Sequence, residues 1–249
     1  MERWVGKVAV VTGSSSGIGA GIAKLLVKKG MRVMGLARRL EKLEAIKKEV
    51  EDQPGEFHPV KCDIRCEDDI INAFKFVEKN FCGVDVLVNN AGLMATTNGL
   101  TDGDTEAWKK VFDTNVMGLC VATREAVRSM KKRQVPGHII HICSIAAYKI
   151  HPGLAPIHNV YPASKFAVRA LAETLRYELE SLNLKIKVSI ICPAYVKTEF
   201  LDAAGQDEPE FLKNAPFLVP ENLAEAVVYV LGTPPNVDVT EMILEPVAV

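Results

Sequence analysis

The 249-residue sequence predicts a single α/β domain, built as a doubly wound parallel sheet of about seven strands with helices on both faces. Segments with strand periodicity alternate along the chain with segments of helical periodicity. Several strand segments carry apolar residues on both faces, which is typical of strands covered on both sides. No repeat, low-complexity segment or linker divides residues 1–249, and sheets of this kind commonly reach about 200–250 residues in one domain.

In the first half of the chain, four segments predict strands by their apolar pattern, and each is followed by a helical pattern. Gly30 caps the first predicted helix, Pro54 stops the second, and Pro136-Gly137 ends the fourth. The predicted elements are strand Lys7–Thr12, helix Ile18–Lys29, strand Met31–Ala37, helix Leu40–Glu51, strand His58–Cys62, helix Glu67–Lys79, strand Val84–Val88 and helix Asp104–Arg133.

The second half continues the alternation, with an extended loop at Lys149–Val160 and an irregular stretch after Cys192. Because parallel strands are joined by right-handed crossovers, few topologies remain, and the doubly wound sheet is the natural one. The predicted elements are strand His138–Cys143, helix Tyr161–Leu182, strand Lys185–Cys192, helix Glu221–Leu231 and strand Val237–Leu244.

Composition argues against several classes of function. The net charge is -1 and the pI about 6.5, without the basic stripe that nucleic acid or an anionic membrane would require. The longest nearly continuous apolar stretch, Ile139–Ala147, is far too short to span a bilayer. The amino terminus reaches the first predicted strand without a signal-peptide pattern, so we expect a cytoplasmic protein.

Cysteine and histidine spacing does not predict a metal site. The six cysteines include Cys62 and Cys66, but no second pair or suitably spaced histidines complete a ligand set, so we expect buried thiols in a reducing compartment. For His138 and His141 we favour packing or surface roles. For His151 and His158, in the extended loop, contact with a substrate remains open.

The segment between the first strand and the first helix is rich in glycine and serine. Glycines permit a tight turn and let backbone N–H groups approach a pyrophosphate, and the helix N-terminus adds positive potential, as in Rossmann-type sheets. The spacing differs from GxGxxG, and the absence of a GxxxxGK(S/T) segment here excludes a nucleotide-hydrolysing P-loop. The predicted cofactor-binding residues here are Gly13, Ser14, Ser15, Ser16, Gly17, Ile18 and Gly19.

The end of the second strand indicates the cofactor. An NAD site needs a carboxylate there for the ribose 2′-hydroxyl, whereas this chain has Ala37-Arg38-Arg39. A guanidinium pairs with the 2′-phosphate of NADP, which a carboxylate would repel. We therefore predict that Arg38 and Arg39 select NADP, with NAD as the alternative cofactor.

Three motifs occur in order on this scaffold: the Thr12–Gly19 loop, Asn89-Asn90-Ala91-Gly92 after the fourth strand, and Tyr161-Pro-Ala-Ser-Lys165 opening a late helix. With Asp63 and Asn115, this combination resembles the short-chain dehydrogenase/reductase family over Lys7 to about Leu244. The resemblance implies cofactor contacts from Asp63, Ile64, Asn90, Ala91, Gly92, Tyr161, Lys165, Val196 and Thr198. It also implies a homodimer or homotetramer formed through the two long helices, Asp104–Arg133 and Tyr161–Leu182.

The predicted catalytic residues are Tyr161, Lys165, Ser144 and Asn115. Lys165 lies one helical turn after Tyr161, where its ammonium group favours the phenolate and lets Tyr161 act as acid and base. Ser144, at the end of the fifth strand, would hold the substrate oxygen as charge develops there. Asn115 would keep a water-linked proton path to Lys165. Tyr161 and Ser144 are also the predicted substrate contacts.

The sequence thus predicts an NADP-dependent alcohol dehydrogenase or carbonyl reductase that acts on a lipophilic alcohol or ketone. Within the family the chain is similar to the member-11 group, which includes insect farnesol-type alcohol dehydrogenases and vertebrate carbonyl or ketosteroid reductases. A catalytically silent NADP-sensing or scaffold protein is the alternative. Apolar residues expected to wall the substrate pocket are Leu154, Ile157, Phe200, Leu201, Phe211, Leu212, Phe217 and Leu218.

Overall fold

The computed structural model describes residues 1–94, 99–203, 205 and 209–248, without the side chains of residues 156, 157, 202, 203 and 211. Seven strands form one fully parallel sheet in the order β3-β2-β1-β4-β5-β6-β7, which confirms the predicted doubly wound sheet. The strands are β1 (Val8–Thr12), β2 (Arg32–Ala37), β3 (Glu56–Lys61), β4 (Val86–Asn89), β5 (Gly137–Ile142), β6 (Ile186–Pro193) and β7 (Glu241–Leu244).

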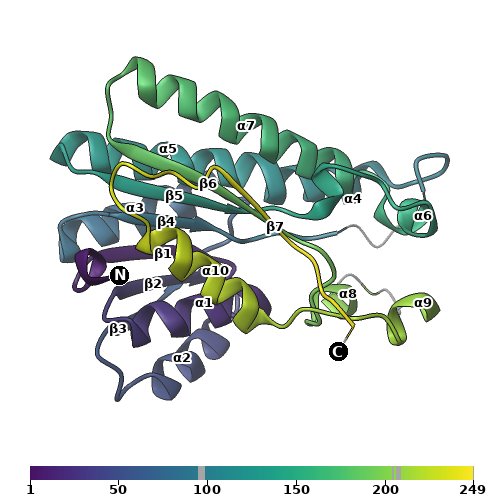
Figure 1. Cartoon of the computed structure of the whole chain (residues 1–249), viewed down its shortest axis with the longest axis horizontal. Coiled ribbons are helices and arrows are strands. Elements are labelled where there is room, and N and C mark those ends of the chain that lie inside the picture. The colour runs from purple at the N-terminus through teal and green to yellow at the C-terminus, as the bar shows by residue number, and fades with distance from the viewer. Residues whose placement is uncertain (95–98, 204, 206–208, 249) are drawn as a thin grey trace.

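Helices cover both faces of the sheet (Figure 1). One face carries α1 (Gly17–Lys28), α2 (Leu40–Glu49) and α10 (Pro220–Gly232); the other carries α3 (Glu67–Phe81), α5 (Gly118–Arg133) and α7 (Tyr161–Ser181). Side chains of a strand point alternately to the two faces. In β1, Ala9 and Val11 therefore pack in the first core, whereas Val8 and Val10 pack in the second.

The predicted helix Asp104–Arg133 is interrupted by one wide turn. Asp104 caps α4 (Thr105–Phe112) by accepting a hydrogen bond from the Ala107 N–H at 2.8 Å. Residues Asp113–Met117 then form a π-helical turn before α5 begins. At the start of α5, a Cβ on Gly118 would lie 2.4 Å from the Ile64 carbonyl oxygen, so only glycine permits this close approach.

The strand bounds differ from prediction at the sheet edges. β3 begins earlier, at Glu56, and the last strand begins only at Glu241 rather than at Val237. Before Glu241, side chains bond to the backbone carbonyls. Arg176 donates to Thr240 O at 2.6 Å, which also accepts from Ile190 N of β6, and Lys187 donates to Val237 O. Short helical turns occupy Glu2–Trp4, Ile145–Ala147, Pro152–Leu154, Ala155–His158 (α6), Phe200–Ala203 (α8) and Glu210–Lys213 (α9).

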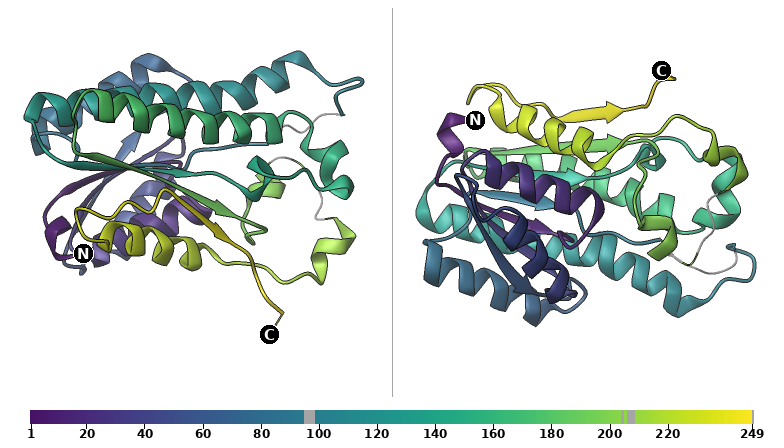
Figure 2. Two further views of the ribbon diagram at one scale, coloured as in Figure 1. Left: turned by 45° about the horizontal axis from the view of Figure 1, so that its top comes forward. Right: turned by 90° about the horizontal axis from the view of Figure 1, so that it is seen from below.

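The carboxyl ends of the strands point toward one end of the molecule, where α6, α8 and α9 also lie (Figures 1 and 2). Thr12, at the end of β1, joins that strand to the turn after β4. Its buried hydroxyl oxygen accepts hydrogen bonds from the N–H groups of Asn90 and Ala91, both at 3.0 Å. In return, the Asn90 side-chain amide donates to the carbonyl oxygens of Thr12 and Gly13. These four bonds hold two neighbouring strand ends in register.

Thr12→Val should lower the free energy of unfolding by about 1–3 kcal/mol, because two N–H groups lose their acceptor while the side chain keeps its shape. Urea unfolding followed by circular dichroism measures the change. Thr12→Ser is the matched control, since it retains the accepting oxygen. Equal stability of the valine and serine variants would contradict this role of the hydroxyl.

Two buried histidines of β5 make stability depend on pH. Burial lowers the pKa of both His138 and His141 from 6.5 to about 3. His138 Nε2 bonds to the Ser189 hydroxyl at 2.8 Å, and His141 Nδ1 lies 3.1 Å from the Asn89 amide nitrogen. Both imidazoles are therefore neutral in the folded protein at any mildly acidic pH.

Because the unfolded chain binds these protons more readily, the histidines do not lower the free energy of unfolding above about pH 6.5. Below that pH the free energy of unfolding falls as the pH drops toward 3. At about pH 5.5 each histidine should lower the free energy of unfolding by about 1–1.5 kcal/mol, compared with its value at about pH 7.5. His138→Gln places an amide near the imidazole Nε2 position and should remove one histidine's share of this slope. Urea unfolding at the two pH values tests it, and an unchanged slope in the variant would count against the assignment.

Candidate active site

The loop between β1 and α1 depends on glycine. Gly13 and Gly17 have φ of 67° and 54°, in the left-handed region. A Cβ on Gly13 would lie 2.8 Å from the Ala91 Cα, and one on Gly19 would lie 2.4 Å from the Gly13 carbonyl oxygen. The loop can therefore fold against the β4 turn only with these residues, as the sequence predicts.

The start of α1 offers hydrogen-bond donors and a buried hydroxyl. The N-cap Ser16 does not cap the helix with its side chain, so its first N–H groups are not satisfied in that way. Ser14 Oγ is fully buried and has no hydrogen-bond partner among the described residues. An uncapped helix N-terminus fits an anionic pyrophosphate.

Arg39, rather than Arg38, contacts the glycine-rich loop. Its Nη2 donates to Ser16 Oγ at 2.7 Å and to Ser15 Oγ at 3.1 Å. Arg38 is exposed and forms no hydrogen bond or ion pair with the described part of the chain. Its positive charge nevertheless contributes to lowering the pKa of Asp63, after the larger effect of hydrogen bonds from Arg65. Arg39 thus lies beside the glycine-rich loop, whereas the charge of Arg38 acts on Asp63 after β3.

Asp63 is held by its neighbours at the end of β3. Its carboxylate accepts two hydrogen bonds from the Arg65 Nε, at 3.0 and 3.2 Å, and one from Arg65 Nη2 at 2.6 Å. Its own N–H donates to Asp69 Oδ2. The next residue, Ile64, packs partly buried on the α3 and α5 side and approaches Gly118.

Asn115, Ser164, Tyr161 and Lys165 are brought together at the start of α7. Asn115 lies in the π-helical turn, and its amide donates to Ser164 Oγ at 3.0 Å and to Leu93 O at 2.9 Å. Ser164 Oγ donates to Tyr161 O at 2.6 Å. The Asn115 side chain therefore ties α7 to the chain after β4, instead of bonding directly to Lys165.

Lys165 is buried beneath Tyr161. Its Nζ donates to Ile142 O at 3.2 Å, lies 5.7 Å from the Tyr161 ring centroid and is 5% exposed as a residue. A Cβ on Gly92 would meet both Lys165 Nζ at 3.7 Å and Asn115 Oδ1 at 3.5 Å. Gly92 therefore leaves space directly beside two of the predicted catalytic residues.

Ser144 follows β5 and faces the same corner. Its Oγ accepts a hydrogen bond from Ala146 N at 3.1 Å, which caps the short turn Ile145–Ala147. Ala146 packs with Tyr161 and Met94 in a small apolar cluster, against which Phe200 and Leu201 also pack. Ser144 and Tyr161 thus border one apolar wall. The sequence predicts Phe200 and Leu201 as members of this wall, but not Met94 or Ala146.

The other residues proposed for the substrate wall are dispersed. Leu218 belongs to the core under α1 and α10, and Phe217 is exposed with Lys197 Nζ 4.9 Å from its ring centroid. The side chains of Ile157 and Phe211 lie outside the described residues. Sequence periodicity could not separate wall from core here, because both are apolar.

The loop histidines differ from each other. His158 stacks against Tyr161, with ring centroids 5.5 Å apart, and burial lowers its pKa. His151 is exposed and accepts a hydrogen bond from Gly153 N at 3.2 Å. Of the two, His158 is the one placed beside the predicted acid and base.

The segment after β6 reaches back over the glycine-rich loop. A Cβ on Gly17 would lie 3.3 Å from Thr198 Cγ2, and Val196 forms a single parallel bridge with Leu218. The predicted residues Val196 and Thr198 therefore lie across the loop from β1, at the same end of the sheet.

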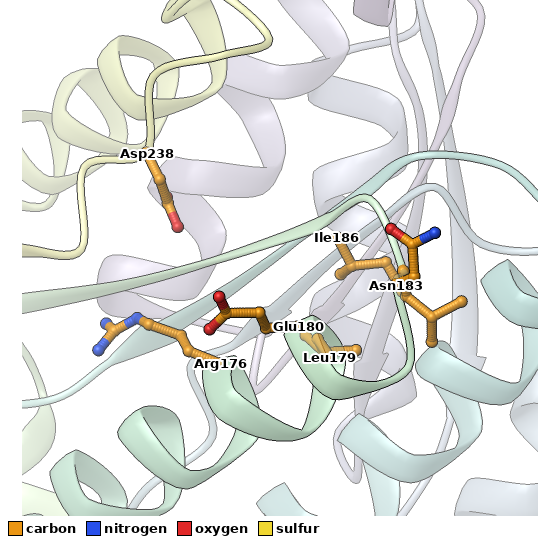
Figure 3. Close-up of a pocket in the computed structure, with 7 residues that line it drawn as sticks. Arg176, Leu179, Glu180, Asn183, Ile186 and Asp238 are labelled. Carbon is orange, nitrogen blue, oxygen red and sulfur yellow. The ribbon is translucent and has the colours of Figure 1, made fainter.

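A hollow of about 330 Å³ lies elsewhere, beside the carboxyl-terminal half of α7 (Figure 3). Arg176 at its edge donates to Val188 O at 3.0 Å and to Thr240 O, so this side chain fastens β6 to the segment before β7. Ile186, which begins β6, also lines the hollow, at the opposite end of that strand from the Tyr161 cluster. The hollow is therefore not part of the candidate site.

Across the described residues, no three histidine, cysteine or acidic side chains gather as a metal ligand set. Within the same part of the chain, no helix is long and apolar enough to cross a membrane.

Comparisons with known proteins agree with this architecture. The sequence of Aedes aegypti farnesol dehydrogenase is 50% identical over 248 residues, covering 99% of this chain and 98% of that protein. Dehydrogenase/reductase SDR family member 11 of Bos taurus is 41% identical over 253 residues, covering 99% and 98%. The structure of an alcohol dehydrogenase from Thermococcus sibiricus, complexed with 5-hydroxy-NADP, matches with a TM-score of 0.83 and 28% identity over 96% of this chain and 95% of that one.

Another similar structure was determined in complex with NAD, so likeness of fold alone does not distinguish the two cofactors. Residues 7–209 match the model of the short chain dehydrogenase family. Because this match covers most of the chain and the relatives align over nearly all of it, the chain belongs to the short chain dehydrogenase family of oxidoreductases.

Proposed function

We propose that the protein is an NADP(H)-dependent oxidoreductase that interconverts a lipophilic alcohol and its carbonyl compound. The observation that carries this proposal is the joining of Tyr161, Lys165 and Asn115 at the start of α7, directly across from the glycine-rich loop. Gly92 leaves space beside Lys165 and Asn115, and an apolar wall adjoins Tyr161. A dinucleotide on the loop and an apolar substrate against the wall would meet there.

Residues of the chain would transfer the proton and hold the substrate oxygen. NADPH, when bound, supplies the hydride for reduction, and NADP accepts it in oxidation. Tyr161 Oη would give its proton to the carbonyl oxygen in reduction and take it back in oxidation. Ser144 Oγ would donate a hydrogen bond to the same oxygen, which holds it as charge develops. The buried Lys165 ammonium would stabilise the phenolate, and Asn115 fixes the α7 turn that carries both residues.

The preference for NADP rests on the corner between β2 and the loop. Two arginines directly follow β2, and the residues there include no carboxylate for a ribose 2′-hydroxyl. Arg39 already lies on Ser15 and Ser16, where a phosphate would have hydroxyl and guanidinium donors on one side.

The proposed substrate class follows from the wall beside Tyr161. Met94 and Ala146 are buried there, with Phe200 and Leu201 packed against them, and this apolar surface suits a lipophilic substrate better than a sugar. The 50% identical relative is named a farnesol dehydrogenase, which supports a terpenoid-like alcohol; a keto-steroid fits the same chemistry.

We further propose that residues 1–249 form a single NADP-binding domain in a cytoplasmic homo-oligomer. All six cysteines are free thiols, which is compatible with a reducing compartment, but Cys66 and Cys82 are exposed rather than buried as expected. Phe166 and Tyr177 are 42% and 64% exposed on α7, and α7 and α5 lie together on one outer face (Figure 1). A second copy packed on this face would bury them in a symmetric dimer or tetramer.

Tyr161→Phe should reduce turnover by about 100- to 10,000-fold, because the ring and its packing remain while the proton donor is lost. NADPH binding should stay nearly intact. Loss of NADPH absorbance with a panel of lipophilic aldehydes and ketones measures turnover, and calorimetric titration measures binding. Turnover within tenfold of the wild type would assign the proton transfer to another group, and a wild type that binds NADPH but turns over no carbonyl would favour the silent NADP-sensing alternative.

Arg38→Ala and Arg39→Ala should each weaken NADPH binding, by about tenfold to a hundredfold for a lost charge-assisted hydrogen bond, with little change for NADH. Ala37→Asp should go further, because its carboxylate repels the 2′-phosphate and accepts a hydrogen bond from the 2′-hydroxyl of NADH. Titration with both cofactors checks this. A wild type that prefers NADH, or equal weakening of both cofactors, would overturn the NADP assignment.

A further inference from the structure

The carboxylate of Glu199 lies between two cations beside the glycine-rich loop. Lys42 Nζ, from the first turn of α2, donates to its two oxygens at 3.2 and 3.1 Å. Arg39 Nη1 lies 3.6 Å from Glu199 Oε2, while Nη2 of the same guanidinium donates to the hydroxyls of Ser15 and Ser16. The hydrogen bond from Lys42 lowers the pKa of the Glu199 carboxyl, so this group is an anion at neutral pH.

A cavity of about 350 Å³ opens at this point, and Ser15, Ser16, Lys42 and Glu199 all contribute to its wall. Glu199 is more than 150 residues away from Lys42 in sequence and directly follows Thr198, which lies over Gly17. The chain therefore brings an anion of its own to a place where two cations and two hydroxyls already converge.

We propose that Lys42 is a third cation of the 2′-phosphate subsite, and that Glu199 occupies this subsite until NADP binds and its 2′-phosphate takes the place of the carboxylate. This inference rests on the proposed preference for NADP. It assigns Lys42 and Glu199 as specificity-determining residues of opposite effect: Lys42 favours the 2′-phosphate, and Glu199 competes with it.

The exchange is physically reasonable because a phosphate binds these cations more strongly than a carboxylate does. Glu199, Lys42 and Arg39 are 56%, 39% and 43% exposed in their side chains, and ion pairs as exposed as these contribute little to stability. A phosphate carries more charge and three accepting oxygens, so it forms stronger charge-assisted hydrogen bonds with the same cations. An NAD ribose has no such group and would leave the Glu199 carboxylate in place.

A purely structural ion pair makes a different prediction. If Lys42 and Glu199 only fastened α2 to the segment after β6, removing either partner would disturb the same contact and shift phosphate affinity in the same direction. Competition instead requires opposite directions: loss of Lys42 weakens binding of a 2′-phosphate, and loss of Glu199 strengthens it.

The chain contains a matched control pair on the same cavity. Lys24 and Glu49 form an ion pair there, with side chains 40% and 54% exposed, nearly the same as Lys42 and Glu199 at 39% and 56%. Lys24→Gln therefore changes the net charge of the protein and of the cavity by as much as Lys42→Gln does, and Glu49→Gln by as much as Glu199→Gln does. Neither control variant removes an ion-pair partner of Arg39, Lys42 or Glu199 in the described structure.

The test is calorimetric titration of the wild type and each variant with adenosine 2′,5′-bisphosphate and with adenosine 5′-monophosphate, at one ionic strength. These probes differ only in the 2′-phosphate and need no turnover. Lys42→Gln should weaken the bisphosphate by about three- to tenfold, and Glu199→Gln should tighten it by about two- to fivefold. Both should leave the monophosphate within about twofold, Lys42→Arg should retain most of the wild-type affinity, and the Lys24 and Glu49 controls should match the wild type.

The outcomes separate this inference from the proposed function. A wild type that prefers the bisphosphate, with Lys42→Gln and Glu199→Gln both shifting its affinity in the same direction, overturns the exchange while the NADP assignment stands. The same holds if Glu199→Gln shifts affinity no more than Glu49→Gln, because long-range charge then suffices. A wild type that binds both probes equally overturns the NADP assignment and this inference together.

Discussion

The candidate site depends on one close contact, between the loop after β1 and the turn after β4. A Cβ on Gly13 would overlap the Ala91 backbone, and one on Gly19 would overlap the Gly13 carbonyl and the Asn90 amide, so the contact requires glycine at both positions. Thr12 and Asn90 then fix it with four hydrogen bonds. This contact lies where the strand order reverses, and the crevice that a doubly wound sheet offers to ligands opens there.

The same turn continues to the predicted catalytic residues, so hydrogen bonds link the loop to this cluster. Two residues after Ala91, the backbone of Leu93 both donates to and accepts from the Asn115 side chain. Asn115 in turn reaches Ser164 on α7, one residue from Lys165. Because the amide is buried and bonded in three directions, it orients α7 relative to the β4 turn. A chain of hydrogen bonds through the turn after β4 therefore connects the glycine-rich loop with the backbone of Tyr161.

The sequence predicted the sheet well, because alternating periodicity is a local pattern. The roles of the predicted site residues stay predictions, although the structure brings Asn115, Tyr161 and Lys165 together. Alternating periodicity predicted the strands, and glycine spacing predicted the loop. The π-helical turn at Asp113–Met117 was not predictable, since one extra residue in a turn barely changes an apolar pattern. The close approach of Gly118 to Ile64 that follows it joins residues far apart in the chain. Likewise, nothing local distinguishes Arg38 from Arg39, or marks Met94 and Ala146 as neighbours of Tyr161. These relations come from residues far apart in the chain.

The environment of the histidines explains why the proton chemistry is assigned to a tyrosine. His138 and His141 lie within β5, and burial lowers the pKa of both to about 3, so neither imidazole is charged or reachable at neutral pH. His158 stacks on Tyr161, but burial disfavours its cation too. Lys165 Nζ lies 5.7 Å from the centroid of the Tyr161 ring, so a cation is already present beside this group. A neutral acid that becomes an anion suits this surrounding better than an imidazole that becomes a cation, and Tyr161 is the group of that kind at the apolar wall.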